Sequence, residues 1–535
     1  MAIEHWAPRR ALSRQEEAIT NQLRRVRKLL PFLRRHRHEL FDDAFQTELA
    51  TMYRDTGAGK DPVNPAQMAM ATLVQGYLGV SDATMVQLTV LDLSVQMVLD
   101  CLGSAEPAFS QGAFSDFRAR LITHEMDRRL LERTVELAQT SKEFDWRKLP
   151  KTLRVAIDSS PFEGAGRVED TVNLLGHAAR KVVACAADLL GWSQKRVCRE
   201  SGIPVLLESS VKKALDADWN DPAQKGEALN TLVSQLTSLE RWLGRKLPEE
   251  LQQQPLRATV ATVDQIRKQD LEPVPKGGGE LRIRKGVAED RRVSIEDPEM
   301  RHGRKSKSKR FDGYKRHIAG ELGHDLILAA AITPANRPEE EAVPDLAADI
   351  KRQGFEIGEL NIDRAYINSQ LVDDVLSRRG EVISKPWGSR NGRLFPKSAF
   401  KINLRDRTIT CPDLQTQHFQ LGSVVEFDAE VCDRCGLRPK CTTAENGTGR
   451  SVSIADNEPL QQRLRRLVST SDGRERLRKR VAIEHRLAHL SRRQGRRARY
   501  VGARKNTFDV RRAAAIQNLE TLHRRCVAVE SAKAA

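Results

Sequence analysis

The sequence predicts an α/β protein with a mixed sheet, preceded by an all-α region and interrupted by two inserts of different character. Three observations predict this class. Short segments with alternating apolar residues, such as "TLRVAID", recur between residues 150 and 387. Segments with apolar residues at helical spacing lie before, between and after them. A cysteine-rich stretch then separates the last strand candidate from an arginine-rich C-terminal part.

Residues 1–145 are predicted to form a helical N-terminal domain. The segment "NPAQMAMATLVQGYLG" has Asn64 as its cap, Pro65 at the first helical position and Gly79 at its end. An earlier segment, "SRQEEAITNQLRRVRKLLPFLRRH", has apolar residues at helical spacing and an arginine-rich outer face. Several short helices with basic faces suit a DNA-binding domain. A helical dimerisation or packing module fits the same pattern equally well.

The sheet is expected to begin in residues 150–166, as the first strand of the core. Leu153, Val155 and Ile157 alternate there, which predicts a short buried strand ending at Asp158. A mainly helical insert with a linker follows over residues 167–300. The core resumes over residues 301–387 with further strand candidates and one helix. These are "FDGYKRHIAG", "DLILAAAIT", the helix "RPEEEAVPDLAADIKRQG", "GELNID", which ends at Asp363, and "EVISKPW".

The C-terminal part has three predicted regions. Residues 388–455 form a cysteine-rich β insert that includes the hairpin candidate "FKINLRDRTITCPD". Residues 456–500 contain a long amphipathic helix, which we expect to break near Asp472–Gly473. Residues 501–535 are expected to be a basic tail that includes another amphipathic helix, "FDVRRAAAIQNLETLHRR".

Three acidic residues are distinguished by their positions. Asp158 and Asp363 each close a predicted strand, and side chains at such places commonly line a ligand crevice. Glu484 borders the apolar stripe of the predicted C-terminal helix, one turn after Arg480. Each also fits a structural interpretation, since an Asp can cap a turn and Glu484 can form an ordinary ion pair with Arg480. Asp170 is a second acidic candidate near the first strand, and Asp158 is preferred because it ends that strand.

Carboxylates from two strand ends and a helix would suit two Mg²⁺ or Mn²⁺ ions, which prefer hard oxygen ligands. Two such ions roughly 3.5–4 Å apart can activate a water or a 3′-hydroxyl and stabilise the leaving oxygen in phosphodiester displacement. The pentapeptides "RVAID", ending at Asp158, and "RVAIE", ending at Glu484, look alike. One is predicted as a strand and the other as a helix, so we attribute the likeness to chance and expect only the two carboxylates to meet.

The net charge of +17 indicates a polyanionic partner, with DNA or RNA as the first candidate. Between Gln461 and Arg512, 18 Lys and Arg accompany 4 Asp and Glu, and between Arg301 and Arg316, 8 basic residues accompany a single acidic one. Such clusters can follow a phosphate backbone, although part of each run also fits a solvated or disordered loop. No run of 18 apolar residues and no apolar secretory segment occurs, so we expect a cytoplasmic protein with no membrane partner.

Four of the eight cysteines lie close together in the β insert, at Cys411, Cys432, Cys435 and Cys441. A Cys-x2-Cys pair with two further cysteines can supply four thiolates to a tetrahedral Zn²⁺. The five-residue gap before Cys441 is wider than in the tightest zinc motifs, so buried or free thiols are the alternative. Bound zinc would stabilise a small insert with little core of its own. The remaining cysteines are expected to act as small buried apolar residues: Cys101, Cys185, Cys198 and Cys526.

Taken together, these features resemble the DDE transposases of bacterial insertion sequences. The matching stretches are "VAIDSSPFEGAGRVEDTVNLL", "LNIDRAYINS", "RKRVAIEHRLAHLSRRQGRRARYVG" and "DPVNPAQMAMATLVQGYLGVSDATMVQL". The resemblance covers most of the chain and implies a ribonuclease H-like catalytic core with Asp158, Asp363 and Glu484 as its acidic triad. It also implies a homodimer or higher homo-oligomer on DNA, associated with the nucleoid.

Related transposases surround this Glu with Tyr, two residues, Arg, three residues, Glu, six residues and Lys. Arg480 fits the Arg position, whereas Leu477 occupies the Tyr position and Ser491 the Lys position. Arg492 is adjacent to Ser491 and can replace the lysine as a phosphate contact. The residues expected to contact DNA are Arg480, Arg492, Arg493, Lys315, Arg316 and Arg364.

The function implied by the resemblance is cleavage of phosphodiester bonds at the terminal inverted repeats of an insertion sequence. The freed 3′-hydroxyl would then be joined to target DNA. Two alternatives are an inactive or domesticated DNA-binding protein derived from a transposase, and a ribonuclease H-like nuclease without strand transfer. The first alternative predicts a broken acidic triad, and here all three members are present.

Overall fold

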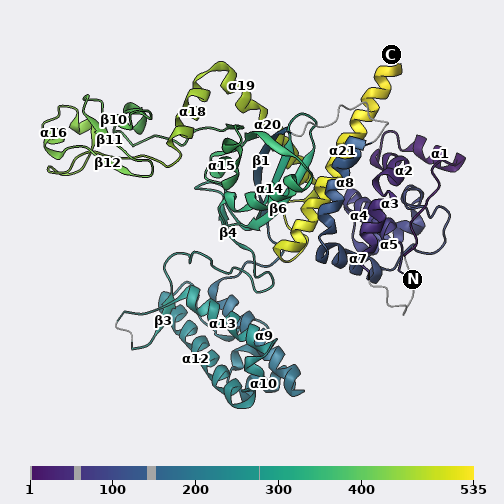
Figure 1. The fold of residues 1–535 in the computed structure, drawn as a ribbon. Helices are drawn as coiled ribbons and strands as arrows, with labels where there is room; N and C mark the ends of the chain where they lie inside the picture. Colours follow the sequence, from purple (N-terminus) through teal and green to yellow (C-terminus); the bar gives the residue numbers. More distant parts are fainter. Residues whose placement is uncertain (1–2, 54–61, 141–151, 276–277, 535) are drawn as a thin grey trace.

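The computed structural model describes residues 3–53, 62–140, 152–275 and 278–534. A mixed sheet lies at its centre with helices around it, so the α/β class predicted from the sequence is confirmed (Figure 1). The strands follow the order β4-β5-β1-β7-β8, and β6 also pairs with β5. Their bounds are Thr152–Glu163 (β1), Arg301–Arg304 (β4), Arg310–Glu321 (β5), Ile327–Pro334 (β6), Glu356–Asn361 (β7) and Glu381–Ile383 (β8).

Strand pairing differs on the two sides of β1. It is antiparallel with β5, which pairs in the same way with β4 and β6. It is parallel with β7, and β7 is parallel with β8. Leu153, Val155 and Ile157 of β1 are all buried. Helix α14 (Val343–Arg352) packs against β6, and α15 (Gln370–Ser377) packs against β7 and β8.

Both predicted strand ends at the acidic residues are wrong. Residues after Asp158 continue to pair with β5, so β1 extends to Glu163 and Asp158 lies within a strand. β7 ends at Asn361, and Asp363 instead caps the short 3-10 helix η4 (Arg364–Tyr366). The last residue pair between β1 and β7 is Ala156 with Asn361, so this pairing stops at the end of β7 while β1 continues to Glu163.

The N-terminal region is helical, as predicted. Its helices are α1 (Arg14–Gln22), α2 (Leu29–Leu40), α3 (Asp43–Ala50), α4 (Pro65–Leu78), α5 (Asp82–Leu91), α6 (Leu93–Leu99), α7 (Gln111–Thr123) and α8 (Met126–Thr140). Asn64 caps α4, with Pro65 in its first turn and Gly79 at its C-terminal cap. These helices share one hydrophobic core with the sheet. The N-terminal helices therefore act at least in part as a packing module against the sheet, which is one of the two interpretations that the sequence allowed.

The link between the sheet and the N-terminal helices is α21 (Ala503–Ala534), which runs between them (Figure 1). It packs against β6, α8 and α4. Asn518 on this helix is fully buried, accepts a hydrogen bond from the Ile327 N–H of β6 at 2.7 Å and donates one to the Thr134 hydroxyl of α8 at 2.9 Å. The segment expected as a basic tail thus contains a central packing element.

The helical insert has a separate hydrophobic core. It comprises α9 (Thr171–Leu190), α10 (Gln194–Glu200), η1 (Pro204–Leu206), α11 (Val211–Ala214), α12 (Pro222–Lys246), η2 (Glu250–Gln252), α13 (Leu256–Asp270) and the hairpin β2 (Leu271–Pro273) and β3 (Leu281–Ile283). In Figure 1 it projects below the sheet.

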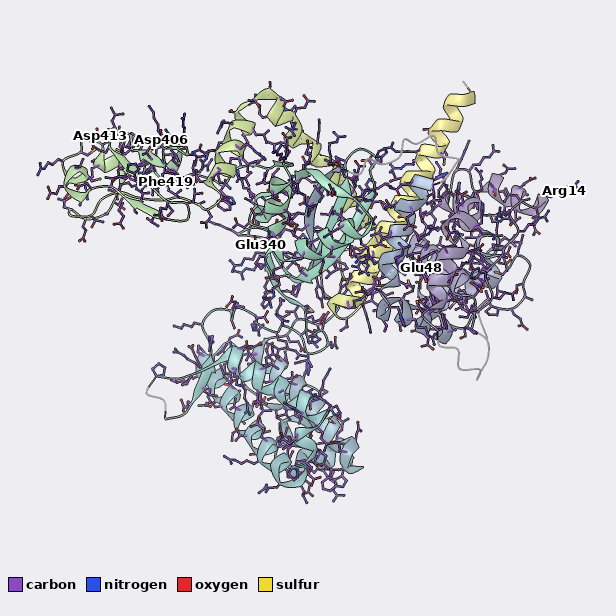
Figure 2. The ribbon with its side chains drawn as sticks, in the orientation of Figure 1. Arg14, Glu48, Glu340, Asp406, Asp413 and Phe419 are labelled. Carbon is purple, nitrogen blue, oxygen red and sulfur yellow. The ribbon has the colours of Figure 1, made fainter. Side chains whose placement is uncertain are left out.

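The cysteine-rich insert projects to the other side of the sheet from the N-terminal helices (Figure 1). Its labelled residues Asp406, Asp413 and Phe419 lie far from Glu48 of α3 (Figure 2). It contains η5 (Lys397–Ala399), β9 (Lys401–Asn403), β10 (Thr408–Thr410), β11 (Thr416–His418), β12 (Val424–Glu426), α16 (Ala429–Asp433), α17 (Arg438–Cys441) and β13 (Ser451–Ser453). Its own core is small and consists of Phe400, Ile409, Phe419, Val425, Phe427, Val452 and Ile454.

Three helices lead back from this insert to the sheet: α18 (Glu458–Ser469), α19 (Ser471–Lys479) and α20 (Val481–Gln494). The break expected near Asp472–Gly473 falls just before these residues, at Thr470, whose hydroxyl accepts a hydrogen bond from the Gly473 N–H at 3.0 Å. Arg480 forms a second junction, between α19 and α20. Within the described residues, none of the helices combines the length and apolar composition needed to span a membrane.

Candidate functional site: an acidic cleft with a basic rim

The three carboxylates singled out in the sequence line one cleft of about 530 Å³ beside the central sheet. Asp158 comes from β1, Asp363 from the cap of η4, and Glu484 from α20. The remaining lining residues are Ser159, Ser160, Pro161, Arg304, Lys305, Phe311, Lys315, Glu339, Arg480, Leu487, Ala488 and Ser491. Residues more than 300 positions apart in the chain therefore meet at one site.

The parallel register of β1 and β7 places Asp158 and Asp363 at the same level. The last residue pair between these strands is Ala156 with Asn361, and each aspartate lies two residues further on. Beyond that pair the two chains separate, which leaves room for the cleft. The position at the end of parallel pairing is the reason that both carboxylates face a common space.

Glu484 reaches the cleft because α20 packs closely on the sheet. Ile483, Leu487 and Leu490 form the buried stripe of α20, as their spacing predicts. Gly320 of β5 permits this approach, since a Cβ there would lie only 2.7 Å from Ile483 Cδ1. Glu484 itself stays exposed at the border of the buried stripe.

Arg480 lies between two of the three carboxylates. Its Nη2 donates a hydrogen bond to Glu484 Oε1 at 2.7 Å, and its Nη1 lies 3.4 Å from Asp158 Oδ1. Burial raises the pKa of Asp158 to about 6, although Arg480 and the Ser159 N–H both lower it. The negative charges of Glu484 and Glu339 raise it further. The site therefore holds more negative charge than this single arginine balances.

Glu339 is a fourth carboxylate in the cleft that sequence reasoning missed. It opens the short helix η3 (Glu339–Ala342), before α14. In "RPEEEAVPDL" it is the first of three consecutive glutamates, which look like ordinary acidic residues in the first turn of a helix. Only its proximity to Asp158 distinguishes it from its neighbours, and that proximity depends on the tertiary structure.

The donor set suits a hard divalent cation, because carboxylate oxygens line the cleft and the Arg480 cation already lies between two of them. The residues that would hold such an ion are Asp158, Asp363 and Glu484. Across the described part of the chain, no three His, Cys, Asp or Glu side chains are close enough together to hold one metal ion as they stand. Metal binding would therefore require these carboxylates to lie closer together than they do here.

The basic residues predicted to contact DNA fall into two groups. Lys315 lines the cleft, and Arg364 and Arg492 are exposed near its edges. Arg316, the next residue after Lys315, is buried, stacks on Phe162 with its guanidinium carbon 4.6 Å from the ring centroid, and hydrogen-bonds Ser160 Oγ at 2.9 Å. In this structure Arg316 is therefore a packing residue, held against Phe162 and Ser160 of β1 and Gln494 of α20.

Arg493 is also engaged within the protein. Its Nη2 lies 2.6 Å from Glu520 Oε1 of α21, and its guanidinium lies over the Tyr77 ring.

Asp170, the alternative to Asp158, caps α9 of the helical insert and forms an ion pair with Lys212 at 2.9 Å. It does not line the cleft. Ser491 and Leu477 occupy the Lys and Tyr positions of the pattern that related transposases show around the Glu. Ser491 lines the cleft and Leu477 does not.

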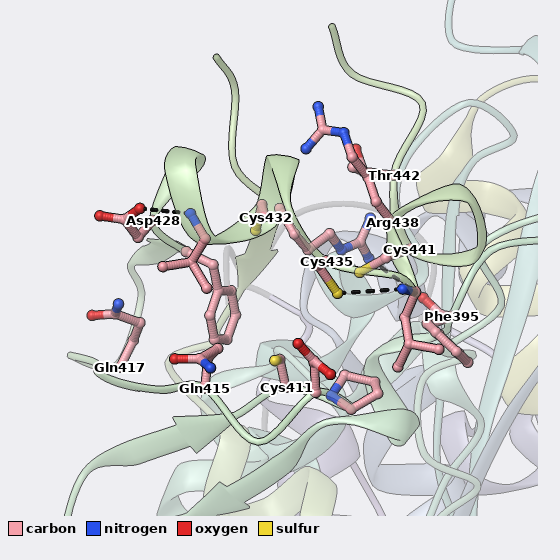
Figure 3. A pocket seen from close by; sticks show the side chains of 16 residues that line it. Phe395, Cys411, Gln415, Gln417, Asp428, Cys432, Cys435, Arg438, Cys441 and Thr442 are labelled. Atoms are coloured by element: carbon pink, nitrogen blue, oxygen red, sulfur yellow. Dashed lines mark hydrogen bonds between the residues drawn. The ribbon is translucent and has the colours of Figure 1, made fainter. Parts of the chain in front are cut away.

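The four clustered cysteines line one small cavity of about 40 Å³ in the cysteine-rich insert (Figure 3). Cys411 follows β10, Cys432 lies on α16, Cys435 follows it, and Cys441 ends α17. Cys435 Sγ accepts a hydrogen bond from the Leu437 N–H at 3.4 Å. Burial raises the pKa of Cys441, and the three other thiols of the cluster raise it further. Outside the cluster, Cys198 is buried and Cys101, Cys185 and Cys526 are partly buried.

Two family models match the chain. Residues 16–120 match a transposase domain described as DUF772, which includes most of the N-terminal helices. Residues 408–523 match a transposase DDE domain, which includes the cysteine cluster and Glu484 but neither Asp158 nor Asp363. No curated protein matches the chain, and no solved structure does.

The site is an acidic cleft beside a mixed sheet, rimmed by lysine and arginine. The two matches confirm the resemblance to a DDE transposase of insertion-sequence type. They support a transposase function in general terms, and the DDE domain indicates an enzyme of the polynucleotidyl-transferase kind.

Proposed function

We propose that this chain cleaves DNA at the ends of an insertion sequence and joins the freed 3′-hydroxyl to target DNA. The observation that carries the proposal is that Asp158, Asp363 and Glu484, from three separate elements, line one cleft. The sheet order β6-β5-β1-β7-β8, with β5 antiparallel and β7 and β8 parallel to β1, is the arrangement expected of a ribonuclease H-like core.

The three carboxylates would hold two Mg²⁺ or Mn²⁺ ions. When bound, such ions would activate the attacking water or 3′-hydroxyl and stabilise the leaving oxygen. Cleavage and joining are both in-line displacements at a phosphodiester, so one site can serve both. Arg480, released from Asp158 and Glu484 by the incoming positive charge, would be free to contact a DNA phosphate.

The rim of the cleft supports DNA as the substrate. Lys305 and Lys315 line the cleft, and Lys307, Lys309 and Arg310 continue the basic surface along the exposed turn between β4 and β5. Lysines and arginines in such a row can follow a phosphate backbone without reading base sequence. We expect the active form to be at least a homodimer on paired terminal inverted repeats, in the nucleoid.

A strand-transfer assay tests the proposal. A duplex with the element's terminal inverted repeat and a recessed 3′-hydroxyl is incubated with the protein and a supercoiled target plasmid. We expect joined products with Mg²⁺ or Mn²⁺ and none with a chelator. Cleavage of an end duplex without joining would favour a nuclease without strand transfer. Binding without either reaction would favour a DNA-binding derivative of a transposase.

A structural zinc site in the cysteine-rich insert is a second, independent proposal. Cys411, Cys432, Cys435 and Cys441 surround one cavity, and thiolates are preferred ligands of Zn²⁺. The Leu437 N–H bonded to Cys435 Sγ would support a thiolate at that position. Zinc would tie together β10, α16 and α17, whose shared core is small.

A further inference from the structure

A chain of buried polar side chains runs under the floor of the cleft, from β6 through β5 to η4. His317 Nδ1 lies 3.1 Å from the Tyr366 hydroxyl, and His317 Nε2 lies 2.9 Å from the Thr333 hydroxyl. His317 and Tyr366 have no exposed surface, and Thr333 is only 9% exposed. The two rings also meet edge to face, with centroids 6.4 Å apart.

Burying a chain of polar side chains costs free energy unless every polar group forms a hydrogen bond. Apolar side chains of similar size would fill the same space without that requirement. Burial lowers the pKa of His317 to about 3, so the imidazole is neutral and uses both nitrogens in hydrogen bonds. A fully satisfied network of this kind fixes the positions of its members.

The network connects the elements that carry the two aspartates. His317 is the residue of β5 directly opposite Ser159, the neighbour of Asp158. Tyr366 belongs to the single helical turn that Asp363 caps, and its N–H donates to the Asp363 carbonyl at 3.1 Å. Tyr366 thus joins the Asp363 turn to β5 at the level of Asp158.

We propose that Tyr366 and His317 are positioning residues that hold Asp158 and Asp363 at the separation required for metal binding. This inference rests on the proposed function, because it assigns these aspartates a shared metal. The hydroxyl of Tyr366 anchors the η4 turn, and His317, held by Thr333, fixes that hydroxyl. Residues that orient metal ligands without touching the metal typically change metal affinity or activity by roughly 10–100-fold when mutated.

The chain offers a matched control for this role. Tyr314 is a second fully buried tyrosine of the same sheet, and its hydroxyl donates a hydrogen bond to Asp297 at 2.6 Å. It does not line the cleft. Tyr366→Phe and Tyr314→Phe each remove one buried phenol hydrogen bond, so both should lower the urea midpoint of unfolding. Only Tyr366→Phe should disturb the aspartates.

The experiment measures Mn²⁺ affinity of the full chain by electron paramagnetic resonance, together with kcat and KM for cleavage of an end duplex. Tyr366→Phe should weaken Mn²⁺ binding by roughly 10–100-fold and lower kcat with little change in KM, while Tyr314→Phe matches wild type in both. Should Tyr366→Phe fail to fold, Thr333→Val tests the same network from its far end, with an effect in the same direction.

Equal Mn²⁺ affinity in Tyr366→Phe and Tyr314→Phe would overturn the positioning role. If wild type binds Mn²⁺ and cleaves the end duplex, and Tyr366→Phe does both equally well, the positioning role fails while the proposed function stands. Wild type that neither binds Mn²⁺ nor cleaves would overturn the proposed function, and the positioning role with it.

Discussion

Arg480 offsets part of the negative charge of the cleft in this structure, since it contacts both Asp158 and Glu484. Asp158 is the more buried of the two carboxylates, with 16% of its side chain exposed against 47% for Glu484. Its raised pKa reflects that burial first and the neighbouring negative charges second. The ionised form of Asp158 therefore destabilises the folded protein even with Arg480 beside it.

The first prediction concerns Asp158→Asn and pH. The folded-state pKa of about 6 lies above the ordinary aspartate value of 3.8, so the folded protein holds this proton more tightly than the unfolded chain. Stability of wild type should therefore fall as pH rises from about 4 through 6, and Asp158→Asn should not show this loss. Above pH 7 the variant should be more stable by up to ~3 kcal/mol. Urea unfolding of both proteins across this pH range, without divalent metal, measures their free energies of unfolding. A difference between the two that does not change with pH would contradict this prediction.

Single residues also show where sequence reasoning stops. The sequence placed Asp158, Asp363 and Glu484 at one site, and the structure brings them into one cleft; their catalytic role stays a prediction. Lys315 and Arg316 were expected together at the DNA, yet only Lys315 lines the cleft, because Arg316 is buried against Phe162 and Gln494, which come from distant segments. Glu339, His317 and Tyr366 were missed because their significance depends on contacts between distant segments.

Among the structural elements, α21 carries the most unexpected role. Asp127 of α8 is buried and pairs with two arginines of α21, Arg504 at 2.5 Å and Arg511 at 3.2 Å. Arg511 also reaches Asp349 of α14 at 3.2 Å. These ion pairs join the N-terminal helices, α21 and the helix that covers β6. Some of the basic residues of α21 thus form ion pairs with acidic residues of the same protein.

The second prediction tests that junction. Asp127→Asn removes the buried partner charge of Arg504 and leaves Arg511 paired with Asp349 alone, which should cost about 3 kcal/mol in the free energy of unfolding. Asp116→Asn, at an exposed position of α7, should change it by less than about 0.5 kcal/mol. Urea denaturation of both variants measures the difference. Equal stability of the two variants would mean that the junction contributes little.

The third prediction concerns zinc in the cysteine-rich insert. Protein purified without chelators should contain one zinc per chain, and Cys435→Ser should lose most of it. Cys101→Ser, outside the cluster, should keep the metal. Metal analysis of the three proteins, with thermal unfolding before and after chelation, provides the measurement. Wild type without zinc would rule the site out, leaving four neighbouring thiols.

Element types were predictable from periodicity, whereas element ends were not. The alternation in "TLRVAID" identified β1, but its continuation to Glu163 depends on pairing with β5, a segment about 150 residues away. The break in the C-terminal helix was expected near Asp472–Gly473 and falls at Thr470, whose hydroxyl caps α19. The burial of α21 could not be read from its arginines, since their partners Asp127 and Asp349 lie elsewhere in the sequence.

Across the whole molecule, the positive charge is unevenly distributed. Residues 456–535 contain 21 Lys and Arg against 8 Asp and Glu, which is 13 of the 17 net charges. The helical insert, residues 167–300, has 21 of each sign, and residues 1–145 have 18 basic against 20 acidic. The positive field that would attract DNA under the proposed function therefore comes mainly from residues 456–535 and not from the N-terminal region.

The fourth prediction follows from this distribution. Replacing Lys305, Lys307 and Lys309 together by Ala should weaken DNA binding and reduce the slope of log affinity against log salt by up to ~3. Replacing Lys181, Lys195 and Lys213 of the electrically neutral insert should leave the slope unchanged. All six lysines are exposed, so neither change should disturb the core. Fluorescence anisotropy over a range of salt concentrations measures both slopes. Equal slopes in the two triple variants would place the DNA elsewhere.

The central claim is that Asp158, Asp363 and Glu484 form one metal-dependent centre for DNA cleavage. Its most direct test is cleavage of a labelled end duplex by wild type, Asp158→Asn, Asp363→Asn and Glu484→Gln, with Glu475→Gln on neighbouring α19 as control. We expect Mg²⁺- or Mn²⁺-dependent cleavage by wild type and by Glu475→Gln. The other three variants should lose at least roughly 10³-fold in cleavage rate while still binding DNA. Undiminished cleavage by any one of those three variants would contradict it.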